Sequence, residues 1–85
     1  MRQRESQSGK VLRMLRYGVV LRKVHKGRMP VGTVAMLNLG IMNGGDAIWK
    51  ARKIEPRIMM RKVKVGVGEN ATEVAEYYLP RGEEP

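Results

Sequence analysis

The sequence predicts an α+β fold, with one main helix packed on a small sheet of about four strands. The longest uncharged stretch, which includes 29–44 and ends before Asp46, carries apolar residues at helical spacing. Several other stretches are rich in β-branched residues or alternate apolar with charged residues, as strands do. A chain of 85 residues is also long enough for only one small domain.

Both ends of the sequence differ in composition from its middle. Residues 1–9 are polar and lack periodicity, which predicts a flexible basic tail. Residues 80–85, PRGEEP, predict a flexible acidic tail. We therefore expect a single α+β domain at 10–79.

The segment after the N-terminal tail divides at a glycine. Val11, Leu12 and Leu15 have helical spacing, which predicts a short basic helix at 10–17. The β-branched residues that follow Gly18 predict a strand at 18–25.

The uncharged stretch predicts the main helix, at 31–42. Val34, Leu37 and Ile41 recur at positions i, i+3 and i+7. Asn-Gly-Gly at 43–45 is typical of a helix end, because Asn and Gly accept the left-handed backbone conformation.

The remaining strands are predicted from composition and alternation. Ile48 and Trp49 stand before a basic group and indicate a short strand at 46–52. Within 57–67, valines alternate with lysines, as in a strand with one apolar side. Gly-Glu-Asn at 68–70 has the composition of a turn, and 71–79 is predicted to be the returning strand.

The composition removes several kinds of chemistry. There is no cysteine and only one histidine, His25, so disulfides, thiolate catalysis and sulfur-ligated metals are excluded. The acids gather toward the C-terminal end, where solvated strand faces explain them. We therefore predict a protein that is not an enzyme, with no catalytic residue, metal site or cofactor.

Positive charge is concentrated in two blocks. The net charge is +9; residues 1–28 carry +8 and residues 50–64 carry +6, whereas residues 65–85 carry −4. Such an excess favours a polyanionic partner, because each phosphate that a cation neutralises releases condensed counterions. Nucleic acid is the partner we expect, ahead of anionic membranes and acidic proteins.

The candidate nucleic-acid-binding residues are the long cations of these blocks, which can contact phosphates from several directions. They are Arg13, Arg16, Arg22, Lys23, Lys26, Arg28, Lys50, Arg52, Lys53, Arg57, Arg61, Lys62 and Lys64. Trp49 is a possible base-stacking residue, although a lone Trp in a short apolar strand is more often part of the core.

Two other interpretations of the sequence remain open. Residues 29–49 could cross a membrane, but only about a dozen are convincingly apolar, whereas a span needs about 20. The first thirty residues, rich in Arg and poor in acids, could be an organellar targeting segment.

Several short motifs resemble the Alba family of small archaeal and eukaryotic nucleic-acid-binding proteins. They are GRMPV, NGG eleven residues later, IWKAR, MRKVKVGVGEN and ATEVAEYYL. The resemblance implies a βαβ-type fold, dimerisation and sequence-tolerant binding of DNA or RNA. It carries over Lys26 and Arg28 in the turn, Lys50 and Arg52 at a strand end, and Lys62 and Lys64 before the hairpin. The chain departs from the family at Met29, where a basic residue is usual, and between Arg52 and Ile58, where the second helix is missing.

The function predicted from the sequence is binding of nucleic acid, RNA rather than DNA, within a ribosome-like ribonucleoprotein particle, through backbone and shape recognition. The alternatives are an Alba-like DNA-binding chromatin protein acting as a dimer, and a structural subunit of a larger protein or membrane assembly. No small-molecule substrate is expected. The expected location is intracellular, in the cytoplasm or an organelle such as the mitochondrion.

Overall fold

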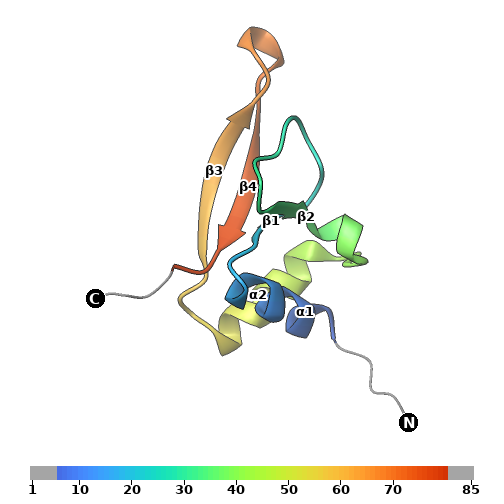
Figure 1. The fold of residues 1–85 in the computed structure, drawn as a ribbon, viewed down its shortest axis with the longest axis vertical. Coiled ribbons are helices and arrows are strands. Elements are labelled where there is room, and N and C mark those ends of the chain that lie inside the picture. Colours follow the sequence, from blue (N-terminus) through green and yellow to red (C-terminus); the bar gives the residue numbers. More distant parts are fainter. Residues whose placement is uncertain (1–5, 81–85) are drawn as a thin grey trace.

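Four strands form one mixed sheet in the order β2–β1–β4–β3 (Figure 1). The structure is a computed structural model that describes residues 6–80. β1 (Val20–Arg22) pairs in parallel with β2 (Thr33–Ala35) and antiparallel with β4 (Thr72–Tyr78). β3 (Met59–Val65) pairs antiparallel with β4 and forms an edge of the sheet. Together with two α-helices, this sheet confirms the predicted α+β class.

Helix α1 (Gln7–Arg16) confirms the first predicted helix but begins three residues earlier than expected. Ser6 is the reason, because its Oγ accepts a hydrogen bond from the backbone N–H of Gly9 at 3.0 Å and caps the helix. The predicted flexible tail at 1–9 is therefore wrong for residues 7–9. The rest of that tail, 1–5, and residues 81–85 of the acidic tail lie outside the described residues.

The predicted strand at 46–52 is wrong, since these residues belong to helix α2 (Gly44–Ile54). Asn43, interpreted from the sequence as a helix end, is the N-cap of this helix, and its Oδ1 accepts from the N–H of Asp46 at 3.2 Å. The buried side of α2 consists of Ala47, Ile48 and Ala51.

The main helix predicted at 31–42 is also wrong. This segment forms the three-residue strand β2 and the short 3₁₀ helix η1 (Met36–Leu39). Gly32 and Gly40 have φ angles of 89° and 80°, in the left-handed region that interrupts a right-handed helix. The apolar residues between them are therefore divided between a strand and a turn of 3₁₀ helix.

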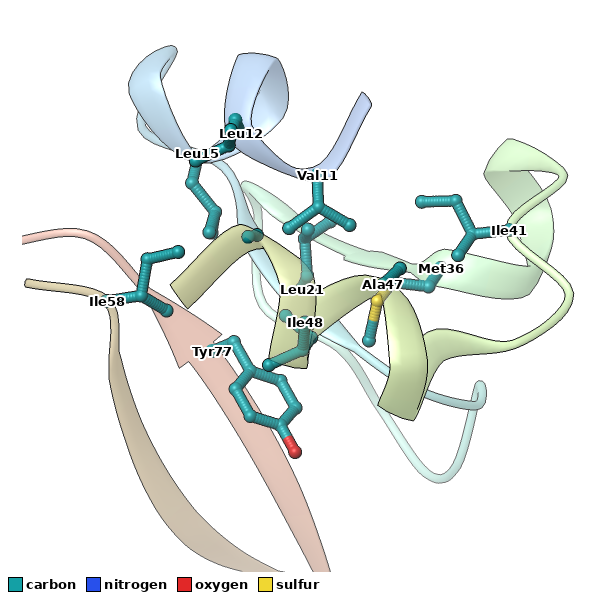
Figure 2. Packing of buried hydrophobic residues seen from close by; sticks show 11 residues of the cluster. Val11, Leu12, Leu15, Leu21, Met36, Ile41, Ala47, Ile48, Ile58 and Tyr77 are labelled. Carbon is teal, nitrogen blue, oxygen red and sulfur yellow. The ribbon is translucent and has the colours of Figure 1, made fainter. Parts of the chain in front are cut away.

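The hydrophobic core lies between the two helices and one face of the sheet (Figure 2). Leu21 of β1 is fully buried at its centre. Ile48 of α2 points toward the ring of Tyr77 in β4, which joins helix and sheet. The other members of the cluster are Val11, Leu12, Leu15, Met36, Ile41, Ala47, Ala51 and Ile58.

The β3–β4 hairpin projects well beyond the two helices (Figure 1). Its strands confirm those predicted within 57–67 and at 71–79, and the 3₁₀ turn η2 (Gly68–Asn70) closes its tip where a turn was expected. The strand predicted at 18–25 is reduced to the three residues of β1, and the chain then leaves the sheet.

Strand alternation gives the sheet two different faces. The helix-side face contains the core residues Leu21 and Tyr77 and the residues in phase with them, Met60, Lys62, Lys64, Glu73 and Ala75. The opposite face contains Arg22, Arg61, Val63, Val65, Val74, Glu76 and Tyr78. The loop at 23–32, which joins β1 to β2, runs up beside the hairpin (Figure 1).

Candidate nucleic-acid interface

Arg22 lies inside the molecule, so its guanidinium is not available to a phosphate. Its side chain is 2% exposed, and its Nε donates to Glu76 Oε2 at 2.7 Å. Its Nη1 donates to the backbone carbonyl of Lys26 at 2.7 Å. The assignment of Arg22 to a nucleic-acid surface is therefore withdrawn, and its role is structural.

Four other candidate cations have carboxylate partners. Arg61 Nε donates to Glu76 Oε1 at 3.1 Å, and its guanidinium lies 4.9 Å from the centre of the Tyr78 ring. Arg57 and Arg16 both face Glu55, at 2.8 Å and 3.8 Å, and Lys50 lies 3.2 Å from Asp46. These cations are more than half exposed, but each has part of its charge compensated within the protein.

Glu55 connects three parts of the chain through one carboxylate. It follows the last residue of α2, accepts from Arg57 Nε just before β3, and lies near Arg16 at the end of α1. The hydrogen bond from Arg57 is the main cause that lowers the pKa of Glu55, and the charges of Arg57 and Arg16 act in the same direction. The same hydrogen bond raises the pKa of Arg57.

Six candidate cations are exposed and have neither an ion pair with a carboxylate nor a contact with an aromatic ring within residues 6–80. We call them the unpaired cations. They are Lys23, Lys26 and Arg28 of the loop, Arg52 of α2, and Lys62 and Lys64 of β3. Their full charge is available to an external anion. Lys53 also lacks an ion pair among these residues, but it lies over the ring of Trp49.

Lys62 and Lys64 lie on the helix-side face of the projecting hairpin. They are two residues apart on one strand, which separates their attachment points by about 7 Å. Lys62 stands opposite Ala75, and Lys64 stands opposite Glu73, which is the one acid on this part of the face. The pair therefore presents two positive charges in a row beyond the edge of the hydrophobic core.

Arg52 is placed by helix α2. It is one turn after Ile48, so the two residues share a side of α2, and Ile48 points toward Tyr77 (Figure 2). Tyr77 pairs with Met60, and Lys62 follows on the same face of β3. Arg52 therefore lies on the side of α2 that faces the base of the hairpin, whereas the two lysines lie farther toward its tip (Figure 1).

The side chain of Lys23 extends over the first turn of α2. Its Nζ lies 3.4 Å from the position that a Cβ on Gly45 would occupy. A cleft of about 220 Å³ separates the loop from β4 and is lined by Lys23, Val24, Lys26, Glu73, Val74 and Ala75. Lys23 and Lys26 therefore lie along residues 73–75 of β4, beyond the two residues of β4 that pair with β1.

Trp49 is 57% exposed, so the preference for a core position is wrong. It lies on the solvent side of α2, and Lys53 Nζ stands 3.8 Å from the centre of its ring. Arg52 is three residues farther along the helix and is its neighbour on the surface. An exposed indole beside cations is suited to stacking on an unpaired base.

Arg13 and Arg16 form a separate group on α1. They line a groove of about 420 Å³ together with Gly9, Leu12 and Tyr17, all on one side of the helix. The sequence could not distinguish them from the other cations, because their local environments are alike in composition.

The partners Glu55 and Glu76 were not singled out from the sequence. Glu55 and Arg57 are close along the chain, so their pairing has a local signal. Glu76 meets Arg22 across 54 residues of sequence, and only the pairing of β1 with β4 brings them together.

Searches against family models, curated proteins and solved structures give no match to this chain. Two elements of the Alba-like arrangement differ here, since 31–42 is not one helix and the Lys-Ala-Arg segment lies in a helix and not at a strand end. Within residues 6–80, neither helix is long and apolar enough to span a membrane. The same residues contain no cluster of three or more side chains of the types that hold a metal ion.

Proposed function

We propose that the protein binds nucleic acid without catalysis, RNA in preference to DNA, as a component of a ribonucleoprotein particle. The observation that carries the proposal is the set of six unpaired cations on the loop at 23–32, on α2 and on β3. When exposed cations without internal partners bind phosphates, no ion pair within the protein has to be broken. The release of condensed counterions from the nucleic acid then contributes favourably to the free energy of binding.

The preference for RNA follows from the surroundings of these cations. Trp49 and Arg52 offer planar groups on which unpaired bases can stack, and RNA loops and ends present such bases. The other cations contact phosphates, which positions the partner but does not read its sequence. We therefore expect recognition of backbone and shape, with weak dependence on base sequence.

The test is binding of the purified chain to single-stranded RNA, duplex RNA and duplex DNA of equal length over a salt series. The double variant Lys62→Ala/Lys64→Ala removes two unpaired cations. Each lost phosphate contact should reduce the slope of log K against log salt by about 0.7 for a single strand, so by about 1.4 in total. Lys50→Ala is the comparison for a single charge that Asp46 partly compensates, and it should change the slope by less than half as much as the double variant.

The possible results separate the alternatives. A tighter complex with RNA and a selective effect of the double variant support the proposal. Equal or tighter binding of duplex DNA contradicts the RNA preference and favours the Alba-like alternative. Weak binding of all three nucleic acids at low salt contradicts both and leaves a structural subunit of a larger assembly.

A further inference from the structure

The loop at 23–32 is fixed to the sheet at two points. Its first part is held by Arg22, which joins the carbonyl of Lys26 to the buried carboxylate of Glu76. Its next residue, Gly27, lies against Val65 at the end of β3, so closely that a Cβ on Gly27 would stand 3.0 Å from Val65 Cβ. The loop therefore reaches from β1 to the far strand of the hairpin.

Both contacts are on the opposite face of the sheet from the helices. Arg22, Glu76 and Val65 share this face by register, and Val74 between them is 9% exposed. The loop thus gives the hairpin the cover that a lone two-stranded ribbon needs in order to be stable in water. In return, the hairpin gives a fixed position to a segment without regular structure.

Four of the unpaired cations are divided between the loop and the hairpin. Lys26 and Arg28 stand on either side of Gly27, which contacts the face of the hairpin away from the helices, while Lys62 and Lys64 lie on the helix-side face of β3. A flexible single strand that contacts both groups must therefore pass around the edge of the hairpin. A nucleic acid that contacts both groups needs them at a constant separation. If the loop were free, binding would have to order it and would lose affinity accordingly.

We propose that docking of the loop on the hairpin preorganises the nucleic-acid surface, with Gly27 and Glu76 as positioning residues. The effect of docking on affinity rests on the proposed function, since it requires that the protein binds nucleic acid. The docking of the loop on the hairpin does not depend on any ligand. Gly27 carries no charge, so any effect of changing it on binding is indirect. Glu76 compensates the charge of Arg61, so changing Glu76 would also alter the charge of the surface, and the test therefore uses Gly27.

Gly27→Ala tests the docking without altering charge. The new methyl group meets Val65, and the φ angle of +66° disfavours a side chain. Gly32→Ala is the matched control: it lies in the same loop with φ of +89°, but a Cβ there has no neighbour within 4 Å. Gly32→Ala carries at least as much backbone strain, because its φ of +89° lies outside the left-handed region that L residues adopt, but it makes no contact with the hairpin.

Two measurements are made on the wild type and on both variants. Backbone hydrogen exchange of the free protein should become faster in the loop and in the outer half of the hairpin for Gly27→Ala, beyond any change in Gly32→Ala. Affinity for single-stranded RNA should fall roughly 5- to 100-fold relative to Gly32→Ala, if two cationic side chains must be ordered on binding.

The outcomes distinguish the two proposals. Faster exchange and weaker binding in Gly27→Ala alone support the inference. Equal affinities of the two variants, in a protein that binds RNA, overturn it. Failure of the wild type to bind nucleic acid rejects the proposed function, and equal exchange in the two variants then rejects the docking as well.

Discussion

The buried pair of Arg22 and Glu76 should behave differently when one partner is removed and when both are removed. Arg22 is 2% exposed and Glu76 is 3% exposed, so each charge depends on the other in place of water. Glu76→Leu leaves the guanidinium without its main partner, and Arg22→Met leaves the carboxylate with only Arg61. We expect either change to lower the free energy of unfolding by about 3–5 kcal/mol.

The double variant Arg22→Met/Glu76→Leu should recover most of that loss. It fills the space with apolar atoms and leaves no uncompensated buried charge. The remaining cost is the Lys26 carbonyl, which loses the donor Arg22 Nη1, at about 1–3 kcal/mol. Arg61 loses a partner too, but it is 53% exposed and water can replace the contact.

Urea unfolding followed by circular dichroism measures all four proteins. A domain of this length has a total unfolding free energy of about 4–13 kcal/mol, so each single variant should unfold at a much lower urea concentration than the wild type, and the double variant at an intermediate one. A double variant that loses the sum of the two single losses would refute the reasoning, because it would mean that the two charges are independently solvated.

Three further changes have expected outcomes. Leu21→Ala, at the fully buried centre of the core, should lower the free energy of unfolding by about 2–5 kcal/mol, as measured by urea unfolding. Gly45→Ala, in the first turn of α2 with only the mobile end of Lys23 nearby, should raise the midpoint of thermal unfolding, with a gain of about 0.5–1 kcal/mol. Because the folded pKa of Glu55 is lowered, its ionised form stabilises the fold above the ordinary pKa of a Glu carboxyl, and this contribution is lost as pH falls through the folded value. Glu55→Gln should therefore flatten the acid side of the stability profile, and an unchanged profile would show that the contact with Arg57 contributes nothing.

Elements with a local signal could be predicted from the sequence. Helix α1 follows from the spacing of Val11, Leu12 and Leu15, all of which are buried. The hairpin follows from alternation, because exposed Lys62 and Lys64 alternate with half-buried Val63 and Val65. The helix shows its core-facing side in a few consecutive residues. The hairpin shows only its alternation, because Val63 and Val65 lie on the face away from the helices.

The elements predicted in the middle of the chain were wrong because Asn-Gly-Gly at 43–45 is compatible with either end of a helix. Asn can end a helix or begin one, and Asn43 begins α2. Asp46 in the first turn, with Ala47 and Ala51 one turn apart, was the available sign of a helix. Instead, Ile48 and Trp49 were interpreted as strand residues, although the helix buries the first and exposes the second.

The candidate site could be predicted only as a list of cations. Composition located the two basic blocks, and all six unpaired cations were on the list. The sequence could not show that Arg22 is buried, because its partner Glu76 lies on a strand 54 residues away. Which charges remain available is decided by tertiary pairing and not by local composition.

The central place of β4 in the sheet also determines when this protein can fold. β1 joins β2 to the rest of the sheet only through Leu21 and Arg22, whose partners on β4 are Tyr77 and Glu76. Contacts between such distant residues form slowly, because the intervening chain must first be brought together. On the ribosome, the sheet therefore cannot close until residue 78 has left the exit tunnel. Until then, the apolar sides of α1 and η1 have no sheet to cover them, and a chaperone or the chain's own partner could bind them first.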